Sequence, residues 1–247
     1  MRYVLALTLL AILTSPLAAQ STKTTEVLAS EVTTVSKFSP DSNYGSSTDA
    51  ALESHNDTAA FIFMRFAGVA DIPGEIVNAR IRIVTRYVVS NEPSGETIVV
   101  SDPLYGGWQE HEATWNNTIV AETINPPSLP HLGDVENVSE NDTAYVLEGA
   151  QLTQQMEEWR TGVKPIEFGL LLHHDSFGHY SEIYIDSNFS AAIEDRPRLI
   201  VEYEDPDASG DDSVCGISPL ADSGTSAGWV ATLLALLAMF GFARRRA

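Results

Sequence analysis

The chain has 247 residues and a formal net charge of −20, from 34 Asp and Glu against 14 Lys and Arg. Residues 20–205 hold 30 of these acids and 10 of the basic residues, so this central segment carries the whole net charge. Such a field disfavours nucleic acid and anionic polymers as ligands, but it suits neutral sugars and divalent cations held by oxygen atoms. Because Cys215 is the single cysteine, the chain has no internal disulfide framework and its central segment no thiolate chemistry.

Residues 1–19 have the pattern of a signal peptide. Arg2 precedes an apolar run at 3–13, and Ala19 ends a Ser-Pro-Leu-Ala-Ala sequence typical of a cleavage site. The apolar run is too short for a membrane span. We therefore expect cleavage after Ala19 and export of the mature chain from a bacterial cell.

Residues 24–205 are expected to form one all-β domain, an antiparallel β-sandwich of jelly-roll type with one short helix. The length suits a single sandwich, and a hydrophobic content of 44% supports a folded core. Alternating polarity and β-branched or aromatic residues predict strands over 26–37, 59–66, 77–89, 97–100, 144–147, 166–173, 182–186 and 199–203. Helical spacing of apolar residues predicts the helix at 150–160, with Leu152, Met156 and Trp159 on one face.

Two predicted strands show which side chains share a face. In 59–66, one side of the strand carries Phe61, Phe63 and Arg65. In 77–89, Ile81, Ile83 and Tyr87 are expected on the buried side, and the exposed side carries Arg80, Arg82 and Arg86. We expect these arginines to pair with acids on the sheet face; the alternative is a site for acidic sugars.

The segment 107–117 holds two tryptophans, Trp108 and Trp115, among acids, amides and one histidine. An aromatic plane beside hydrogen-bonding side chains suits a sugar ring, which offers C–H faces and hydroxyl edges. We predict carbohydrate contacts at Trp108 and Trp115, joined by Tyr44 and Arg65. The alternative is that both tryptophans are buried core residues.

The turn-rich loop 38–47 is the first candidate metal site. Asp41 and Asn43, with Asp49 beyond the loop, are spaced as oxygen ligands of Ca²⁺ could be, and Asp186 with Asn188 offers a second set. The alternative is ordinary turn chemistry of Asp and Asn.

His173, His174 and His179 lie close in sequence and suggest a metal or general-base site. Adjacent residues of a strand point to opposite faces, so His173 and His174 cannot chelate one ion together. We interpret the three as histidines of a loop surface. Residues 24–205 contain no Gly-x-Ser-x-Gly, His-Glu-x-x-His or phosphate-binding glycine loop, and we expect no catalytic residue.

The C-terminal part reads as a linker followed by a sorting segment. Residues 206–226 are rich in Asp, Ser, Gly and Pro, and are expected to be disordered. Residues 227–247 combine an apolar run with three terminal arginines, which predicts a sorting signal or transmembrane segment. A glycolipid-anchor signal is the alternative, although that signal normally ends apolar.

Seven motifs in order carry a resemblance to a known family, and the resemblance covers roughly residues 26–203. They are Ser-Pro-Asp-Ser-Asn-Tyr-Gly-Ser-Ser at 39–47, Met-Arg-Phe with Ile-Pro-Gly at 64–74, Ala-Arg-Ile-Arg-Ile at 79–83, Trp-Gln-Glu with Thr-Trp-Asn-Asn at 108–117, Glu-Trp at 158–159, Gly-Leu at 169–170, and Arg-Pro-Arg-Leu-Ile-Val-Glu-Tyr at 196–203. The set resembles the DNRLRE domain, which is grouped with carbohydrate-binding modules found beside alginate lyases and in archaeal disaggregatases. The resemblance implies a β-sandwich that binds polysaccharide or cell-surface glycan without catalysis.

The tail resembles bacterial three-part sorting signals of the MYXO-CTERM type, through Cys215-Gly216, the apolar run and the final arginines. This resemblance implies processing near Cys215 by a sorting protease and retention at the cell surface. The sequence thus predicts an exported, surface-held glycan-binding protein. Two alternatives stay open: a structural or adhesive surface protein that binds no glycan, and a glycan-degrading enzyme that uses paired carboxylates.

Overall fold

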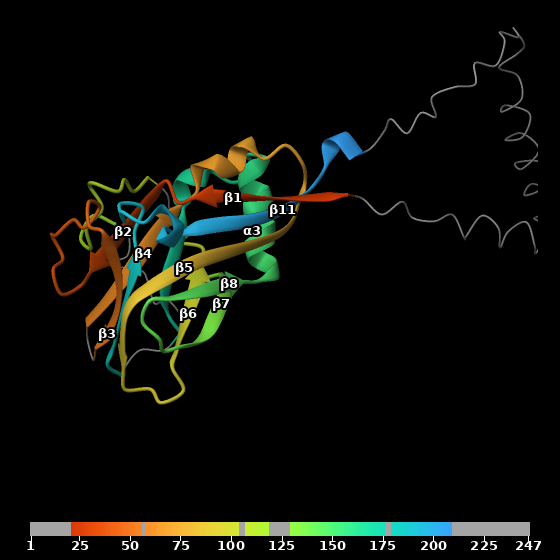
Figure 1. The fold of residues 1–247 in the computed structure, drawn as a ribbon. Coiled ribbons are helices and arrows are strands. Elements are labelled where there is room, and N and C mark those ends of the chain that lie inside the picture. Colours follow the sequence, from red (N-terminus) through yellow and green to blue (C-terminus); the bar gives the residue numbers. More distant parts are fainter. Residues whose placement is uncertain (1–20, 56–57, 104–106, 119–128, 176–178, 209–247) are drawn as a thin grey trace, which may run out of the picture. The chain divides into compact units, whose positions relative to one another are not determined.

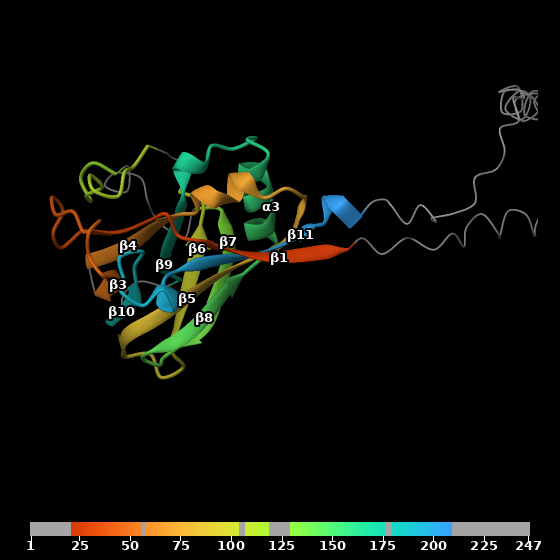
Figure 2. The same ribbon diagram turned by 45° about the horizontal axis from the view of Figure 1, so that its top comes forward.

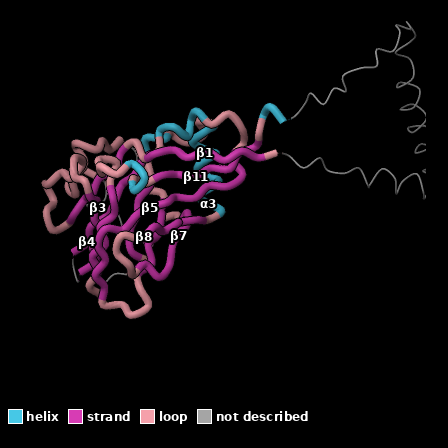
Figure 3. The backbone as a smooth tube through the Cα atoms, viewed as in Figure 1, coloured by secondary structure: helices cyan, strands magenta, loops and turns pink. Residues whose placement is uncertain are grey.

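The strands of the domain close on themselves as one antiparallel sheet, shown by a computed structural model that describes residues 21–55, 58–103, 107–118, 129–175 and 179–208 (Figure 1). In chain order the strands are β1 (Thr22–Leu28), β2 (Glu31–Ser36), β3 (Asp49–His55), β4 (Thr58–Arg65), β5 (Ile76–Ser90), β6 (Glu96–Ser101), β7 (His131–Val138), β8 (Thr143–Glu148), β9 (Leu170–His174), β10 (Ser181–Asp186) and β11 (Arg198–Glu204). The helical elements are α3 (Ala150–Arg160) and the 3-10 turns η1 (Ala67–Asp71), η3 (Ile166–Phe168), η4 (Ile193–Asp195) and η5 (Pro206–Ala208). Strands make up most of the domain, in magenta in Figure 3, so the predicted all-β class with one short helix is confirmed.

The ring runs in the order β5–β10–β3–β4–β9–β6–β7–β8, and β8 pairs with β5 to close it. The long strand β5 makes this possible because both of its edges are paired. Along one edge, its first half pairs with β11 and its second half with β10, and the other edge pairs with β8. On the outer side, β11 carries β1, and β2 pairs with β4 (Figure 2). Closure leaves the ring without an open edge at β8.

The helix α3 covers the part of β5 that β8 does not reach, since β8 pairs with β5 only from Arg80 onward. The N–H of Ile76 donates to Oε2 of Glu157 at 3.0 Å, and the N–H of Ala79 donates to Oγ1 of Thr153 at 3.0 Å. Helix side chains therefore satisfy strand amides that would otherwise lack a partner. The bounds of α3 match the predicted helix, and its expected apolar face, Leu152, Met156 and Trp159, lies in the main core.

A β-bulge corrects the predicted position of Tyr87. Tyr184 of β10 pairs with Tyr87, but the next residue, Ile185, pairs with Thr85, so Arg86 is an extra residue in β5. An extra residue reverses the alternation of faces beyond it. Ile81 and Ile83 are fully buried as predicted, whereas Tyr87 turns outward and is 46% exposed.

Other strand boundaries differ from the predicted ones because the local pattern of polar and apolar residues did not indicate where these strands begin and end. The predicted strand 26–37 is divided into β1 and β2, where the N–H of Ser30 turns to donate to the carbonyl of Arg65 at 2.8 Å. The sequence predicted neither β3 nor β7, whose sequences DAALESH and HLGDVENV carry few β-branched residues and no aromatic one. Pairing with neighbouring strands stabilises them instead.

The chain divides into a unit of residues 1–209 and a second of residues 210–247. The predicted signal peptide with Ala19, most of the linker, Cys215 and the C-terminal segment lie outside the described residues. Within the described ranges, no helix combines the length and apolar character needed to cross a membrane.

Candidate functional site

Trp108 lies in a small hydrophobic cluster on the outer side of β4, with Phe61, Phe63 and Leu171. Only 8% of Trp108 is exposed, and its ring centroid lies 5.4 Å from that of Phe63. Its Nε1 donates to the carbonyl of Phe168 at 2.9 Å. Burial and a satisfied indole N–H support the core interpretation of Trp108 that the sequence left open.

Gly169 makes room for the indole ring. It has a φ of +67°, a left-handed conformation that favours glycine, and a Cβ at this position would lie 2.7 Å from the ring of Trp108. The chain therefore closes over Trp108 from the η3 side.

Arg65 lies above the same ring, with its Cζ 4.4 Å from the ring centroid. The guanidinium forms an ion pair with Glu31 at 2.8 Å, and Nη2 donates to the carbonyls of Trp108 at 2.9 Å and Glu167 at 2.8 Å. The side chain is 11% exposed. The structure thus brings two predicted contact residues together, but the indole N–H of Trp108 and both Nη groups of Arg65 already have protein partners.

Trp115, the third of the predicted contacts, is half-buried and stacks on Phe61 with centroids 5.5 Å apart and planes 30° apart. It forms the outer layer of the cluster.

The predicted calcium ligands are spread along one loop. Asn43 donates to two backbone oxygens of the segment 107–118, at 2.8 Å each, and Oδ1 of Asp41 accepts from Asn116 at 2.7 Å. Asp41 and Asp49 are exposed. Among the residues that the structure describes, no three His, Cys, Asp or Glu side chains are grouped to hold a metal ion. Calcium binding stays a prediction, which a melting-temperature comparison with and without chelator tests directly.

An open pocket of about 310 Å³ lies on the outer face of β2, β3 and β10, beside the loop 38–47. Three aromatic rings line it: Phe38 and Tyr44 from the loop, and Tyr184 from β10. Phe38 is 77% exposed, and the ring of Tyr184 continues outward to that of Tyr87, with centroids 6.0 Å apart. Of the predicted sugar contacts, Tyr44 belongs to this pocket.

Polar groups surround these rings. Thr34, Ser36 and Ser47 supply hydroxyls, and Asp49 and Glu53 supply carboxylates. Burial, then the charge of the neighbouring Glu182, raises the pKa of Glu53, while a hydrogen bond with Tyr184 acts in the opposite direction. Exposed rings beside hydroxyls and carboxylates can hold a ligand that has both an apolar face and hydrogen-bonding edges.

The histidine prediction was wrong, because His173 and His174 are buried on β9, at 2% and 1% exposure. They do face opposite ways: His173 lies near Phe61 of the outer cluster, and His174 points to Glu96. Nε2 of His173 lies 2.9 Å from Oγ of Ser101, and burial lowers the pKa of His173 to about 4 despite a backbone hydrogen bond. Both faces of β9 are covered, which the alternation of residues alone did not show.

Glu96 is the centre of a buried polar cluster. Its Oε2 lies 2.9 Å from Nε2 of His179 and 3.4 Å from Nδ1 of His174, and Ser90 donates to Oε1. Burial acts to raise the pKa of Glu96, but contacts with His174, Ser90 and His179 outweigh it and lower the pKa to about 2. The carboxylate is 3% exposed, so this cluster stabilises the interior.

Two of the three β5 arginines pair with acids, as expected, whereas Nη1 of Arg82 donates to the backbone carbonyl of Glu194 at 2.7 Å. Arg80 and Glu202 are 2.8 Å apart, and Nε of Arg86 is 2.8 Å from Oδ2 of the buried Asp186.

Sequence reasoning missed Phe38, Glu53 and Tyr184 of the pocket. A signal for Tyr184 was present, since Glu182 and Tyr184 alternate with Ile183 and Ile185. Glu53 had no such signal, because β3 was not predicted.

Comparison with known proteins adds one family. Residues 23–124 match the model of carbohydrate-binding module family 96. The matched segment includes eight residues that line the pocket, from Thr34 to Glu53, and leaves out Tyr184. No curated protein is significantly similar to the chain.

Proposed function

We propose that the domain is a non-catalytic carbohydrate-binding module whose ligand lies in the pocket of Phe38, Tyr44 and Tyr184. The observation that carries the proposal is that eight of the nine residues lining this pocket lie in the segment that is similar to a carbohydrate-binding module family. A sugar offers C–H faces for the aromatic rings and hydroxyls for the polar groups around them.

The size of the pocket supports a short glycan segment as ligand. About 310 Å³ is at the small end of the range of ligand pockets. One sugar ring can stack on the exposed Phe38, and its neighbours along the polymer can follow Tyr184 and Tyr87.

The absence of catalysis is part of the proposal, and the position of the acids supports it. Asp49 and Glu53 approach a ligand from the same side, the sheet face, because they alternate with buried residues of β3. Glycoside hydrolysis requires two carboxylates that flank the scissile bond. We expect no release of reducing ends when the protein is incubated with a polysaccharide that it binds.

We further propose export and retention at a bacterial cell surface. The signal-like residues 1–19 and the tail with Cys215 support this proposal. Mass spectrometry of the protein from its native envelope should find an N-terminus at Gln20 and processing near Cys215; an intact N-terminus would contradict export.

A glycan array with the purified chain tests the binding proposal. We expect binding to at least one glycan, and roughly tenfold weaker binding by Phe38→Ala, in line with the loss of one stacked ring. The matched control is Val163→Ala, because Val163 is 76% exposed, much like Phe38, and lies outside the pocket. Binding to no glycan, or equal binding by Phe38→Ala, would overturn the proposal.

A further inference from the structure

The outer face of β3 and β10 carries paired side chains in three successive rungs. Residues directly opposite each other on antiparallel strands share a face. Asp49 pairs with Asp186, Ala51 with Tyr184, and Glu53 with Glu182. An aromatic rung, which continues to Tyr87 of β5, is therefore flanked on each side by two acids.

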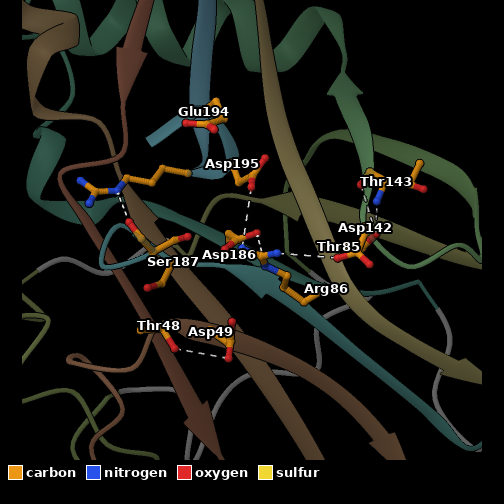
Figure 4. Close-up of polar contacts among 12 residues, drawn as sticks. Thr48, Asp49, Thr85, Arg86, Asp142, Thr143, Asp186, Ser187, Glu194 and Asp195 are labelled. Carbon is orange, nitrogen blue, oxygen red and sulfur yellow. Dashed lines mark hydrogen bonds and ion pairs between the residues drawn. The ribbon is translucent and has the colours of Figure 1, made fainter. Parts of the chain in front are cut away.

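The two acidic rungs differ in their counter-charge. Figure 4 shows Arg86 beside Asp186, with Asp142 and Asp195 nearby, and the Arg86 Nε to Asp186 Oδ2 distance is 2.8 Å. In the described ranges of the chain, no Lys or Arg lies within ion-pair distance of Glu53 or Glu182. The hydroxyl of Tyr180 donates to Oε1 of Glu182 at 2.5 Å, which adds a hydrogen bond but no positive charge.

Like charges directly opposite each other on a sheet destabilise it. The Glu53–Glu182 rung keeps this repulsion, and its Glu53 lines a pocket that also contains aromatic rings, hydroxyls and the carboxylate of Asp49. A ligand that brings a positive charge to this rung would remove the repulsion. The acidic net charge of the domain would also attract such a ligand from a distance.

We infer that the pocket selects a cationic glycan, one that carries free amino groups on its sugar rings. One ring stacks on Tyr184 while its ammonium group lies between Glu53 and Glu182. Asp49, four residues along β3 and thus roughly 13 Å away, is placed to meet a second ammonium group. This inference rests on the proposed function and specifies the ligand of the same pocket.

The test uses two oligomers with the same backbone: β-1,4-linked glucosamine, which is cationic at mildly acidic pH, and its fully N-acetylated form, which is neutral. Calorimetric titration of the full chain should show tighter binding of the glucosamine oligomer, by roughly five-fold for each ion pair formed. Added salt should reduce this preference. Glu53→Gln and Glu182→Gln should each lower the ratio of the affinities for the two oligomers.

The control variant is Glu136→Gln, which removes the same charge from an exposed position on β7 and should leave the preference unchanged. A chelator should change nothing; loss of glucosamine binding in its presence would indicate a bridging metal and overturn the inference. Equal affinity for the two oligomers, or a preference that Glu53→Gln and Glu182→Gln retain, would overturn the inference and leave the proposed function standing. Binding of no glycan of any charge would overturn both.

Discussion

Two aromatic clusters on the outside of the ring use similar residues for different ends. The closed cluster consists of Phe61 and Phe63 from β4 and of Trp108 and Trp115 from the segment 107–118. Arg65 lies over the ring of Trp108. Among the described residues, the open cluster, Phe38, Tyr44 and Tyr184, lines an open pocket with Glu53 at its edge. In the closed cluster, backbone carbonyls and Glu31 bind the guanidinium of Arg65. Beside the open cluster, the described residues provide no cation for the paired carboxylates of Glu53 and Glu182.

The comparison shows that a ring beside a charge does not by itself identify a binding site. What separates the two clusters is whether the chain supplies the groups that would bind a ligand. Around Trp108 it supplies partners for the indole N–H and for both Nη groups of Arg65, so the cluster contributes to stability. Around Tyr184, no Lys or Arg of the described residues forms an ion pair with Glu53 or Glu182, so the cluster can bind a cation. Changes in the first should therefore lower stability, and changes in the second should lower affinity.

The largest effect is expected for Trp108→Ala. Removing this buried ring should lower the free energy of unfolding by about 3–5 kcal/mol, because it leaves a cavity and unpairs the carbonyl of Phe168. Urea denaturation measures the loss. If the free energy of unfolding fell by less than about 1 kcal/mol and glycan binding were lost, Trp108 would be a binding residue and not a core residue.

Acid should destabilise the closed interior in two steps. His173 binds its proton less tightly in the folded protein, so its contribution is complete above pH 6.5 and is lost as the pH falls toward 4. Glu96 holds its charge in the fold down to a pKa of about 2, so its contribution is complete above 4.5 and is lost between 4.5 and 2. Each step should amount to roughly 2–3 kcal/mol.

Urea midpoints measured across this pH range check both steps. Glu96→Gln should be less stable at neutral pH and should lack the lower step, while the upper step persists. An unchanged lower step would show that other carboxylates cause it.

An intermediate effect is expected on the open side. Phe38→Ala should weaken glycan binding by about 1.4 kcal/mol, which is tenfold, and change the free energy of unfolding by less than about 0.5 kcal/mol, since its ring is 77% exposed. Titration and urea denaturation of the same preparation separate the two quantities. A large loss of stability would mean that the open cluster also packs the fold.

The smallest effect is expected for Glu53→Gln without ligand. Because its pKa is raised in the fold, the ionised form of Glu53 disfavours folding, and this penalty grows as the pH rises from the ordinary value through the raised one. The variant should gain a few tenths of a kcal/mol at neutral pH and nothing in acid. Glu136→Gln serves again as the control, and a gain of equal size there would point to the overall charge.

Strong local patterns predicted much of the fold. The helix α3 and the inward set on β5 followed from spacing, because burial of one face imposes that spacing. The bulge at Arg86 broke the pattern, and no local signal distinguishes an outward Tyr87 from an inward one. Strand β3, and with it Glu53, pairs over three residues with the adjacent β4 but over six with β10, far along the chain, so its own residues gave little sign of it.

The candidate site was harder to predict for a related reason. Trp108 and Tyr184 are both large rings near polar residues, and the sequence marked the first more strongly. Whether a ring is free depends on which distant segment covers it. Gly169 and η3 close over Trp108, whereas Tyr184 borders an open pocket in the part of the chain that the structure describes. Such coverage is a property of the assembled domain.

The pairing of β1 with β11 gives the domain one further property. Thr22 is opposite Glu204, the N–H of Asp205 donates to the carbonyl of Ser21 at 2.9 Å, and Lys23 and Asp205 form an ion pair at 2.9 Å. The polypeptide therefore enters and leaves at one place, visible where β1 and β11 run side by side in Figure 1. A unit with this geometry can be spliced into a surface loop of an unrelated protein, or joined end to end and reopened elsewhere, without stretching its backbone.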